Sequence, residues 1–372
     1  LRLSINQSIK PFDSLSHRLE KIREYNLRSG NHFQYCNPDA PKDTYRDFNS
    51  PVCVDSVCAY HHKIFDEMKE GNLTAVHVTI SYHENFRQTI ENIITWNKFI
   101  ELYSDRIMLG RSAEDVRIAY DTNKTAIIFG FQNCSPIEEN IALIEVLHQL
   151  GVRFMQLSYN NQSLLATGCY EINDPGITRF GKQAIKEMNR IGMVIDISHT
   201  SENSSFEAIK LSKRPIVISH ANPDWWHPSK RNKSDSLIKE VTSSGGMIGF
   251  SIYPHHLKDG SNCTLESFSA MIAKSADRYG VDNLGIGSDI CQNQPDNVVE
   301  WMRNGTWSKE IDYGEGSKNN SGFPNQPEWY RKTSDFPNIL EGLENVGFNN
   351  EECSKIMGLN WLKFYEGNFG GS

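Results

Sequence analysis

Short apolar segments recur along the chain from residue 51 onwards, and most are followed by a stretch with helical spacing of its apolar residues. Eight of these segments are rich in β-branched residues and lack strict apolar–polar alternation, which is typical of strands buried on both faces. They cover residues 51–54, 73–80, 125–131, 152–159, 192–199, 214–220, 246–253 and 283–290. Eight strand–helix alternations predict an α/β fold of the (β/α)8 TIM barrel class, with an open doubly wound sheet as the alternative.

The regions outside these strand–helix alternations are expected to surround the barrel. Residues 1–50 are polar and irregular and are predicted to form an N-terminal arm or capping segment, with the barrel over residues 51–372. Residues 291–338 follow the last predicted strand and hold several aromatic residues among Gly, Asn, Ser and Pro. Because long loops in compact domains are usually lids or binding loops, we expect this one at the catalytic end. Two amphipathic helices, near residues 339–346 and 350–365, are expected to close the chain.

Composition and sequence motifs indicate which kinds of binding partner this protein is expected to lack. The net charge is −8, which argues against a nucleic-acid surface because such surfaces need clustered lysine and arginine. No G-x-G-x-x-G motif follows the first predicted strand, no apolar run approaches the ~20 residues of a membrane span, and the first ten residues lack a signal-peptide pattern. The eight cysteines include no C-x-x-C pair, so no disulfide framework is expected. We therefore expect a cytoplasmic protein that acts on a small molecule and binds neither nucleic acid nor membrane.

Two histidines stand at the ends of consecutive predicted strands, His199 after Ile195-Asp196-Ile197-Ser198 and His220 after Val217-Ile218-Ser219. Side chains at the carboxyl ends of barrel strands point into the active site, and adjacent strands lie about 4.8 Å apart. The two imidazoles are therefore expected to meet, and neutral imidazole is a common ligand of Zn²⁺. The alternative is a pair of histidines that only hydrogen-bond within a polar barrel mouth.

An aspartate and an arginine complete the first set of candidates. Asp289 ends the last predicted strand in Gly285-Ile286-Gly287-Ser288-Asp289, where it could move a proton between water and a leaving amine. An ordinary aspartate that caps a turn is the alternative. Arg231 follows His220 by eleven residues and could bind a substrate carboxylate, although such an arginine is often only a surface residue.

These residues lie in segments that resemble the renal (membrane) dipeptidase family. The likeness runs from about residue 52 to residue 365 and is strongest in four segments: residues 180–199, residues 215–220 with the following Arg231-Asn232, residues 284–289 and residues 356–362. The resemblance implies a two-zinc barrel that hydrolyses dipeptides, and by analogy a homodimer. It also implies that His199 and His220 bind one metal, that Asp289 shuttles the proton and that Arg231 holds the substrate carboxylate.

The sequence departs from the family pattern at three positions of the site. Val57 and Ala59 replace the His-x-Asp pair that ends the family's first strand and binds the other zinc. Gln132 replaces the glutamate that bridges the two metals, and a neutral amide cannot bridge two cations as a carboxylate does. Tyr159 replaces a histidine thought to polarise the substrate carbonyl, but a tyrosine can still donate a hydrogen bond to a developing oxyanion.

We therefore expect the usual binuclear centre to be absent. One Zn²⁺, or another divalent metal, is expected on His199 and His220, completed by Asp289, Gln132 or Cys169, with a metal-free site as the alternative. Cys169 could equally be a buried, inert cysteine.

The other polar residues near the ends of the predicted strands are further candidates for the site. Gln132, Asn133 and Gln162 are expected to contact substrate, and Asp55 is an additional candidate. The loop of residues 291–338 contains a set of aromatic residues, namely Trp301, Trp307, Trp329 and Tyr330. These residues could hold a cationic substrate by cation–π contact, or they could simply pack the loop onto the barrel.

Three functions are consistent with this set of residues. The first is a metal-dependent hydrolase of dipeptides or similar small amides. The second is a lyase or isomerase on the same scaffold that uses Tyr159, Asp289 and the histidines as acids and bases, since a barrel supports many chemistries. The third is a non-catalytic binder.

Overall fold

The computed structural model describes residues 58–292, 296–304, 318–319 and 322–369. The arm predicted over residues 1–50 and the strand predicted over residues 51–54 lie outside the described residues, as do Asp55 and Trp307.

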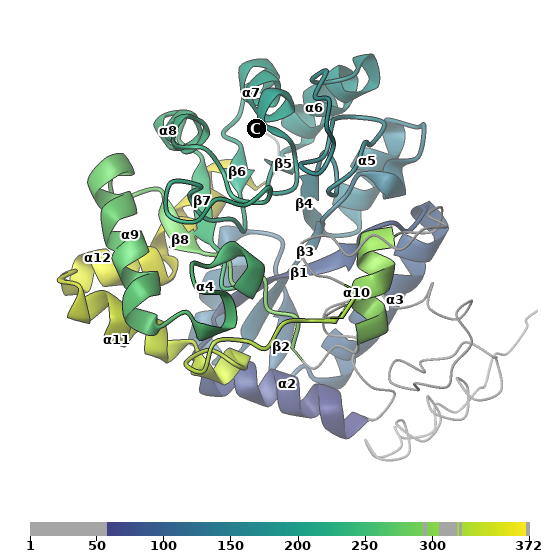
Figure 1. The fold of residues 1–372 in the computed structure, drawn as a ribbon. Coiled ribbons are helices and arrows are strands. Elements are labelled where there is room, and N and C mark those ends of the chain that lie inside the picture. The colour runs from purple at the N-terminus through teal and green to yellow at the C-terminus, as the bar shows by residue number, and fades with distance from the viewer. Residues whose placement is uncertain (1–57, 293–295, 305–317, 320–321, 370–372) are drawn as a thin grey trace, which may run out of the picture.

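A single curled sheet of eight strands forms the centre of the fold (Figure 1). All seven strand pairings are parallel, in the order β1-β3-β4-β5-β6-β7-β8, and β2 pairs with β3. In the described part of the chain no pairing joins β8 to β1. The strands are β1 (Ala75–Ser81), β2 (Ile107–Leu109), β3 (Thr125–Phe131), β4 (Val152–Gln156), β5 (Val194–Asp196), β6 (Val217–Ile218), β7 (Met247–Phe250) and β8 (Leu284–Ile286).

Seven of the eight predicted strands are confirmed: β3 to β8 fall within predicted segments, and β1 extends one residue beyond the segment predicted over residues 73–80. The short strand β2 was not predicted. It pairs only with the first half of β3, from Thr125 to Ile127, while β4 pairs with the second half, from Phe129 to Phe131. Since β1 runs along the whole of β3, β2 and β4 share its other edge.

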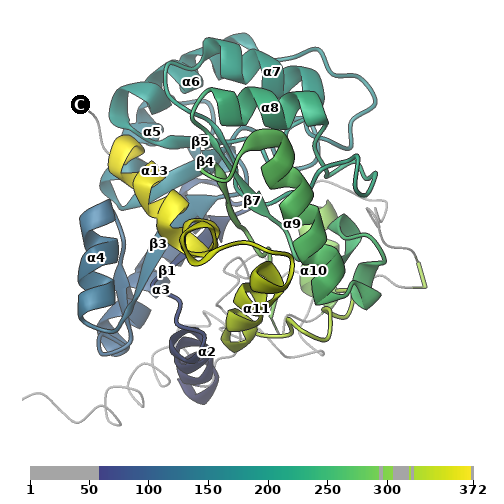
Figure 2. The same ribbon diagram turned by 90° about the vertical axis from the view of Figure 1, so that its left-hand side faces the viewer.

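Helices connect the strands and lie outside the sheet, and Figure 2 shows α5 to α9 as an arc around it. Helix α6 shows how the sequence sets the ends of such a helix: Thr178 caps its first turn through a bond from Gly181 N, and Gly192 ends it in the left-handed conformation at φ 78°. The helices of the barrel are α2 (Cys58–Glu70), α3 (Phe86–Leu102), α4 (Ala113–Asp121), α5 (Ala142–Gln149), α6 (Arg179–Ile191), α7 (Glu202–Leu211), α8 (Asp235–Ser243) and α9 (Leu265–Tyr279).

Four more α-helices follow β8 in the described part of the chain. The two predicted closing helices are confirmed, the first as α11 and the second as α12 and α13 with a π-helical turn between them at Lys355–Leu359. The four are α10 (Asp296–Asn304), α11 (Pro337–Asn345), α12 (Asn350–Ser354) and α13 (Asn360–Asn368).

The buried side chains of the sheet form two layers, an apolar layer and, nearer the carboxyl ends of the strands, a polar layer. One buried cluster takes a side chain from each of five neighbouring strands, namely Ile128, Phe154, Val194, Val217 and Met247. Full burial of each such side chain contributes about 1.5–3 kcal/mol to folding. Two residues further along three of these strands stand Gln156, Asp196 and Ser219, which are polar and buried. The apolar layer thus supports a polar layer at the carboxyl ends of the strands, where barrel active sites lie.

Two findings concern the chemistry of the described residues as a whole. None of their helices has the length and apolar character needed to cross a membrane. Their five cysteines with described side chains, Cys134, Cys169, Cys263, Cys291 and Cys353, are all free thiols.

Candidate active site

Two imidazoles converge at the carboxyl ends of β5 and β6. His199 and His220 each follow their strand within three residues, and both are buried. Their Nε2 atoms lie 3.0 Å apart. The predicted meeting of the two histidines is therefore confirmed.

The hydrogen-bond partners of His199 determine which of its nitrogens carries the proton. Nε2 lies 3.1 Å from Nη2 of Arg231, and a guanidinium can only donate. Nε2 must therefore accept, so the proton lies on Nδ1. Consistent with this, Nδ1 lies 2.6 Å from Oδ1 of Asn160, which accepts.

A buried carboxylate determines the proton position of His220. Asp196 accepts from Ser198 N at 2.9 Å, Ser198 Oγ at 2.6 Å, Ser219 N at 3.1 Å and Ser219 Oγ. Because the single Ser219 hydroxyl proton goes to the carboxylate, this oxygen accepts from Nδ1 of His220 at 2.7 Å. Nε2 of His220 therefore also carries a lone pair.

This arrangement fits one divalent cation held by both Nε2 atoms. In this structure Nε2 of His199 accepts from Arg231, so a cation held by both Nε2 atoms would take the place of that hydrogen bond. Ligating histidines almost always donate their other N–H to a fixed acceptor, as His199 does to Asn160 and His220 to Ser219. The Nε2 separation of 3.0 Å is slightly below the ~3.4 Å expected for two tetrahedral Zn²⁺ ligands.

The described residues do not provide further ligands of the usual types at this position. They contain no group of three or more His, Cys, Asp and Glu side chains placed to hold a metal ion. Gln132, at the position of the bridging glutamate, donates from Nε2 to Oγ1 of Thr79 at 3.0 Å. A neutral amide held in this way does not fit a bridging role between two cations.

Burial and the nearby guanidinium keep both imidazoles neutral. The pKa of His199 is lowered well below its ordinary value, first by burial and then by the charge of Arg231. The same two causes, in the same order, lower the pKa of His220. Neutral imidazole is the form that binds a metal.

Tyr159 lies directly against this pair. Its ring stacks on His199 with centroids 4.3 Å apart, and its edges meet Tyr82 and His83 at 5.4 Å each. Burial raises the pKa of Tyr159 well above its ordinary value, and the negative charge of Asp289 raises it further. The phenol therefore keeps its proton and can donate a hydrogen bond.

Asp289 stands beyond the end of β8 with a left-handed backbone, at φ 54°. Aspartate tolerates this conformation better than most residues. After burial, the charge of Asp289 is among the causes that raise the pKa values of Tyr82, Tyr159 and Cys291. A carboxylate is thus surrounded by three groups that hold their protons.

Two cavities meet at this carboxylate. The larger, about 800 Å³, is lined by β1, by residues 286–292 and by helices on the outside of the sheet. The smaller, about 60 Å³, is lined by His199, Arg231 and Tyr159 among others. Both are lined by Gln132, Asp289 and Cys291, so the cavities adjoin at the candidate catalytic residues.

The loop of residues 221–233 holds Arg231 in place. The Asn232 side chain accepts from Asn222 N at 3.0 Å and donates to His227 O at 2.7 Å and His256 O at 3.0 Å. Arg231 itself is 2% exposed and donates from Nη1 to Ser198 O. These bonds place the guanidinium inside the smaller cavity.

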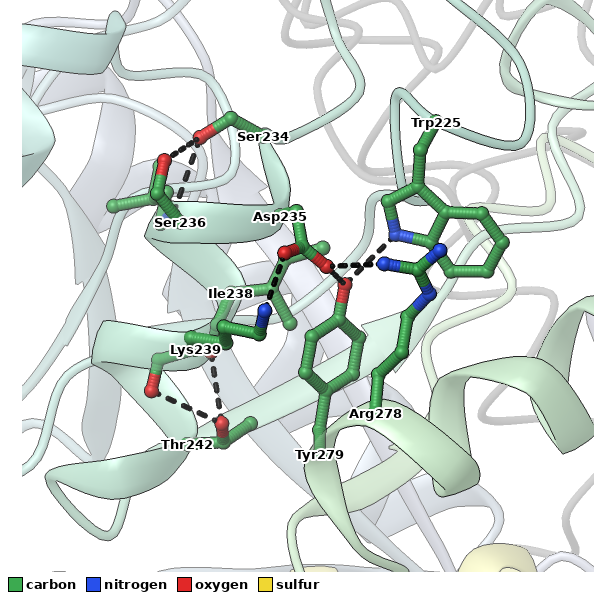
Figure 3. Close-up of polar contacts among 10 residues, drawn as sticks. Trp225, Ser234, Asp235, Ser236, Ile238, Lys239, Thr242, Arg278 and Tyr279 are labelled. Carbon is green, nitrogen blue, oxygen red and sulfur yellow. Dashed lines mark hydrogen bonds and ion pairs between the residues drawn. The ribbon is translucent and has the colours of Figure 1, made fainter.

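A network on α8 and α9 anchors the outer end of the same loop (Figure 3). Trp225 donates from Nε1 to Oη of Tyr279 at 2.8 Å, and Tyr279 donates to Oδ1 of Asp235 at 2.8 Å. Arg278 lies over the Trp225 ring at 4.2 Å and binds the same carboxylate oxygen at 3.0 Å. The arginine loop is therefore tied to the barrel at both ends.

Three predicted site residues lie away from the two cavities. The Asn133 side chain accepts from the neighbouring Cys134 N at 2.9 Å. Gln162 is exposed and donates from Nε2 to Ser163 O and Ala166 O. Cys169 is near the site only indirectly, because its Sγ lies 3.5 Å from Oδ1 of Asn160.

Sequence reasoning missed several residues of the site. Asn160 directly follows Tyr159, so its place after β4 was a usable signal. Asp196 and Ser219 were quoted only as strand residues, although polar residues within apolar strands could have marked them as partners of the histidines. His77, whose Nε2 is buried without a hydrogen-bond partner, lies on β1 inside a predicted strand.

The aromatic residues after β8 lie in two different environments. Trp329 donates from Nε1 to Cys263 O at 2.8 Å and packs on Phe268 at 5.2 Å, and Tyr330 is 1% exposed. Both therefore pack the loop onto the barrel. Trp301, on α10, instead meets Tyr82 at 5.9 Å and His83 at 5.2 Å, next to the site.

The curled parallel sheet, its outer helices and the site at its carboxyl end place the chain among α/β barrels of the metallohydrolase type. The sequence profile of the membrane dipeptidases, peptidase family M19, matches residues 55–302. The chain therefore belongs to the membrane dipeptidase family, and the resemblance noted in the sequence is confirmed.

Individual relatives agree with this assignment. The chain is 27% identical over 286 residues to dipeptidase tcpJ of Claviceps purpurea, covering 76% of this chain and 60% of that protein. An amidohydrolase from Pseudomonas aeruginosa superposes with a TM-score of 0.78 at 35% identity, covering 83% and 93% of the two chains. A metallopeptidase from Rhodobacter sphaeroides, bound to a phosphinate mimic of the dipeptide L-Ala-D-Ala, shares the fold with a TM-score of 0.69 at 17% identity, covering 82% and 89%. The chain spans about 60% of the length of the curated dipeptidases it matches.

Proposed function

We propose that this protein hydrolyses dipeptides or similar small amides with the help of one divalent metal ion, Zn²⁺ in the first instance. The observation that carries the proposal is the convergence of two Nε2 lone pairs 3.0 Å apart, with both Nδ1 protons held by fixed acceptors. Membership of a metallopeptidase family and relatives named dipeptidases support the same reaction class.

His199 and His220 are the residues that would hold the ion. When bound, such an ion acts as a Lewis acid that polarises the scissile carbonyl and activates water. Solvent, Gln132 or substrate would complete its coordination, because no third histidine, cysteine or carboxylate joins the pair among the described residues.

The surrounding side chains supply the other parts of the reaction. Asp289 accepts the proton of the attacking water and returns it to the leaving amine. Tyr159 keeps its proton and donates a hydrogen bond to the oxygen on which negative charge develops. Arg231, fixed by the loop of residues 221–233, binds the carboxylate of the substrate and orients its amide bond.

The test is turnover by untagged protein loaded with Zn²⁺, using dipeptides of L,L and L,D configuration and N-acyl amino acids. Release of free amino acids is followed by mass spectrometry. We expect hydrolysis of at least one group of substrates, and its loss in Asp289→Asn excludes a contaminating peptidase. Protein that holds one ion per chain and hydrolyses none of them would contradict the proposal.

Two further expectations remain proposals. A cytoplasmic location is supported by the five free thiols of the described cysteines, which suit a reducing compartment. A homodimer is supported by the family likeness, and light scattering coupled to size-exclusion chromatography measures it.

A further inference from the structure

Among the described residues that line the smaller cavity, cationic side chains outnumber carboxylates, although the chain as a whole carries −8. Two guanidinium groups, Arg231 and Arg303, line it, and Asp289 is its one carboxylate among the described lining residues. The histidines of the wall add no charge of their own, because burial favours their neutral form. Burial lowers the pKa values of His199, His255 and His256 first, and nearby cationic charge lowers them further.

The second guanidinium comes from α10, which closes one side of the cavity with Val299, Met302 and Arg303. Two contacts hold this helix against the loop after β1. His83 Nε2 lies 3.0 Å from Met302 O, and Trp301 meets the edge of the His83 ring at 5.2 Å. These contacts place α10 beside the loop after β1, with Arg303 lining the cavity.

Arg303 faces the cavity side of this wall. Its charge acts on His255, which lines the same cavity and whose pKa is lowered first by burial and then by Arg303. The two arginines reach the cavity from different elements, Arg231 from the loop after β6 and Arg303 from α10. A ligand between them thus meets two separate guanidinium groups.

We propose that Arg303 is a specificity residue that binds a second carboxylate, so that the preferred substrates are dipeptides with an acidic C-terminal residue. The inference rests on the proposed function, in which Arg231 binds the C-terminal carboxylate. Because Arg303 lines the same cavity, the group it meets belongs to the same residue of the substrate. Guanidinium groups bind carboxylates in a bidentate manner, and a positively charged cavity raises the local concentration of anions.

The size of the cavity agrees with this substrate class. A volume of about 60 Å³ has room for a short polar group. A charged hydrogen bond to one carboxylate changes affinity by roughly 10- to 100-fold. An acidic side chain at the C-terminal residue should therefore be preferred over its neutral amide by a factor of that order.

The test compares kcat/KM for Ala-Glu with Ala-Gln, and for Ala-Asp with Ala-Asn, which differ in charge but hardly in shape. We expect wild type to prefer each acid by roughly 10- to 100-fold, mainly through KM. Arg303→Gln should bring both ratios close to one, and Arg303→Lys should restore part of the preference. Arg87→Gln is the matched control, because Arg87 is a 90% exposed arginine on α3, and it should behave as wild type.

The failure of the inference is distinguishable from failure of the proposed function. Turnover of Ala-Gln and Ala-Ala without a preference for the acids, or a preference that survives Arg303→Gln, overturns the role of Arg303 alone. Absence of turnover on every dipeptide overturns the proposed hydrolase and this inference with it. A normal melting temperature and a normal circular dichroism spectrum of Arg303→Gln show that the variant is folded.

Discussion

His199 and His220 present unprotonated Nε2 atoms to each other across 3.0 Å, at the ends of two neighbouring strands. Neither nitrogen can donate to the other, since both ring protons lie on Nδ1, and Nε2 of His199 accepts from Arg231. In the proposed function this pair would share a cation, and the buried partners of both Nδ1 atoms hold the two rings in place. This relationship underlies the predictions on metal binding and catalysis.

Asn160 should control metal affinity without touching the metal. It fixes the proton of His199 on Nδ1 through the 2.6 Å contact to its Oδ1. We expect Asn160→Ala to weaken Zn²⁺ binding about 10- to 100-fold, measured by competition with a chromophoric chelator. Gln162→Ala, on the same loop but exposed and away from the cavities, serves as control. Equal affinities in the two variants would show that Asn160 has no such role.

Asp289 should be essential for rate and dispensable for folding. Asparagine adopts positive φ as readily as aspartate, so Asp289→Asn keeps the local backbone at φ 54°. We expect kcat to fall about 10²- to 10⁴-fold, because the general base is lost, with the melting temperature and the metal content unchanged. Activity near that of wild type would exclude Asp289 as the proton carrier.

Tyr159 should contribute to kcat through its hydroxyl group alone. Phenylalanine preserves the ring that stacks on His199 at 4.3 Å but cannot donate a hydrogen bond. We expect Tyr159→Phe to lower kcat about 10²- to 10³-fold with little change in KM. A variant in which KM rises and kcat persists would instead assign Tyr159 to substrate binding.

Several histidines should make the fold sensitive to acid. Burial lowers the pKa of His83 to about 4, and burial with the charge of Arg153 lowers the pKa of His148 to about 4. The unfolded chain binds these protons near pH 6.5, so the stabilisation is complete above pH 6.5 and is lost as pH falls towards 4. Burial raises the pKa of Glu84 to about 8, which acts in the opposite direction but concerns one group.

The measurement is the melting temperature at pH 7.0, 6.0, 5.0 and 4.5 for wild type and His148→Gln, a substitution outside both cavities. We expect the wild-type value to fall with pH, and the variant to lose less, with a difference on the order of a few degrees. Parallel curves for the two proteins would contradict the assignment to His148.

The sequence predicted the residues whose position follows directly from strand order. His199, His220 and Asp289 end long apolar runs, so their meeting follows from parallel strands with a common carboxyl edge. Strand β2 was missed because three residues are too few to show a pattern. Gln162 was expected to contact substrate from its place after β4, but place in the chain does not determine side-chain direction. Its amide instead binds the backbone of its own loop.

The hydrogen-bond chemistry of the site was beyond sequence reasoning. The roles of Asp196 and Ser219 depend on which side of β5 and β6 faces inward and on distances of 2.6 to 3.1 Å. Arg303 lies on α10, where only the three-dimensional arrangement brings it to the cavity of Arg231. These contacts join residues that are far apart in the sequence, so no local sequence pattern predicts them.

The most direct test is the metal content of untagged protein, measured by plasma mass spectrometry after equilibration with Zn²⁺ and removal of excess ion. One zinc per chain in wild type, falling to a trace in His199→Ala and in His220→Ala but retained in Asp289→Asn, is the predicted result. Two ions per chain, none, or an ion that survives the loss of either histidine would contradict a single metal held by this pair.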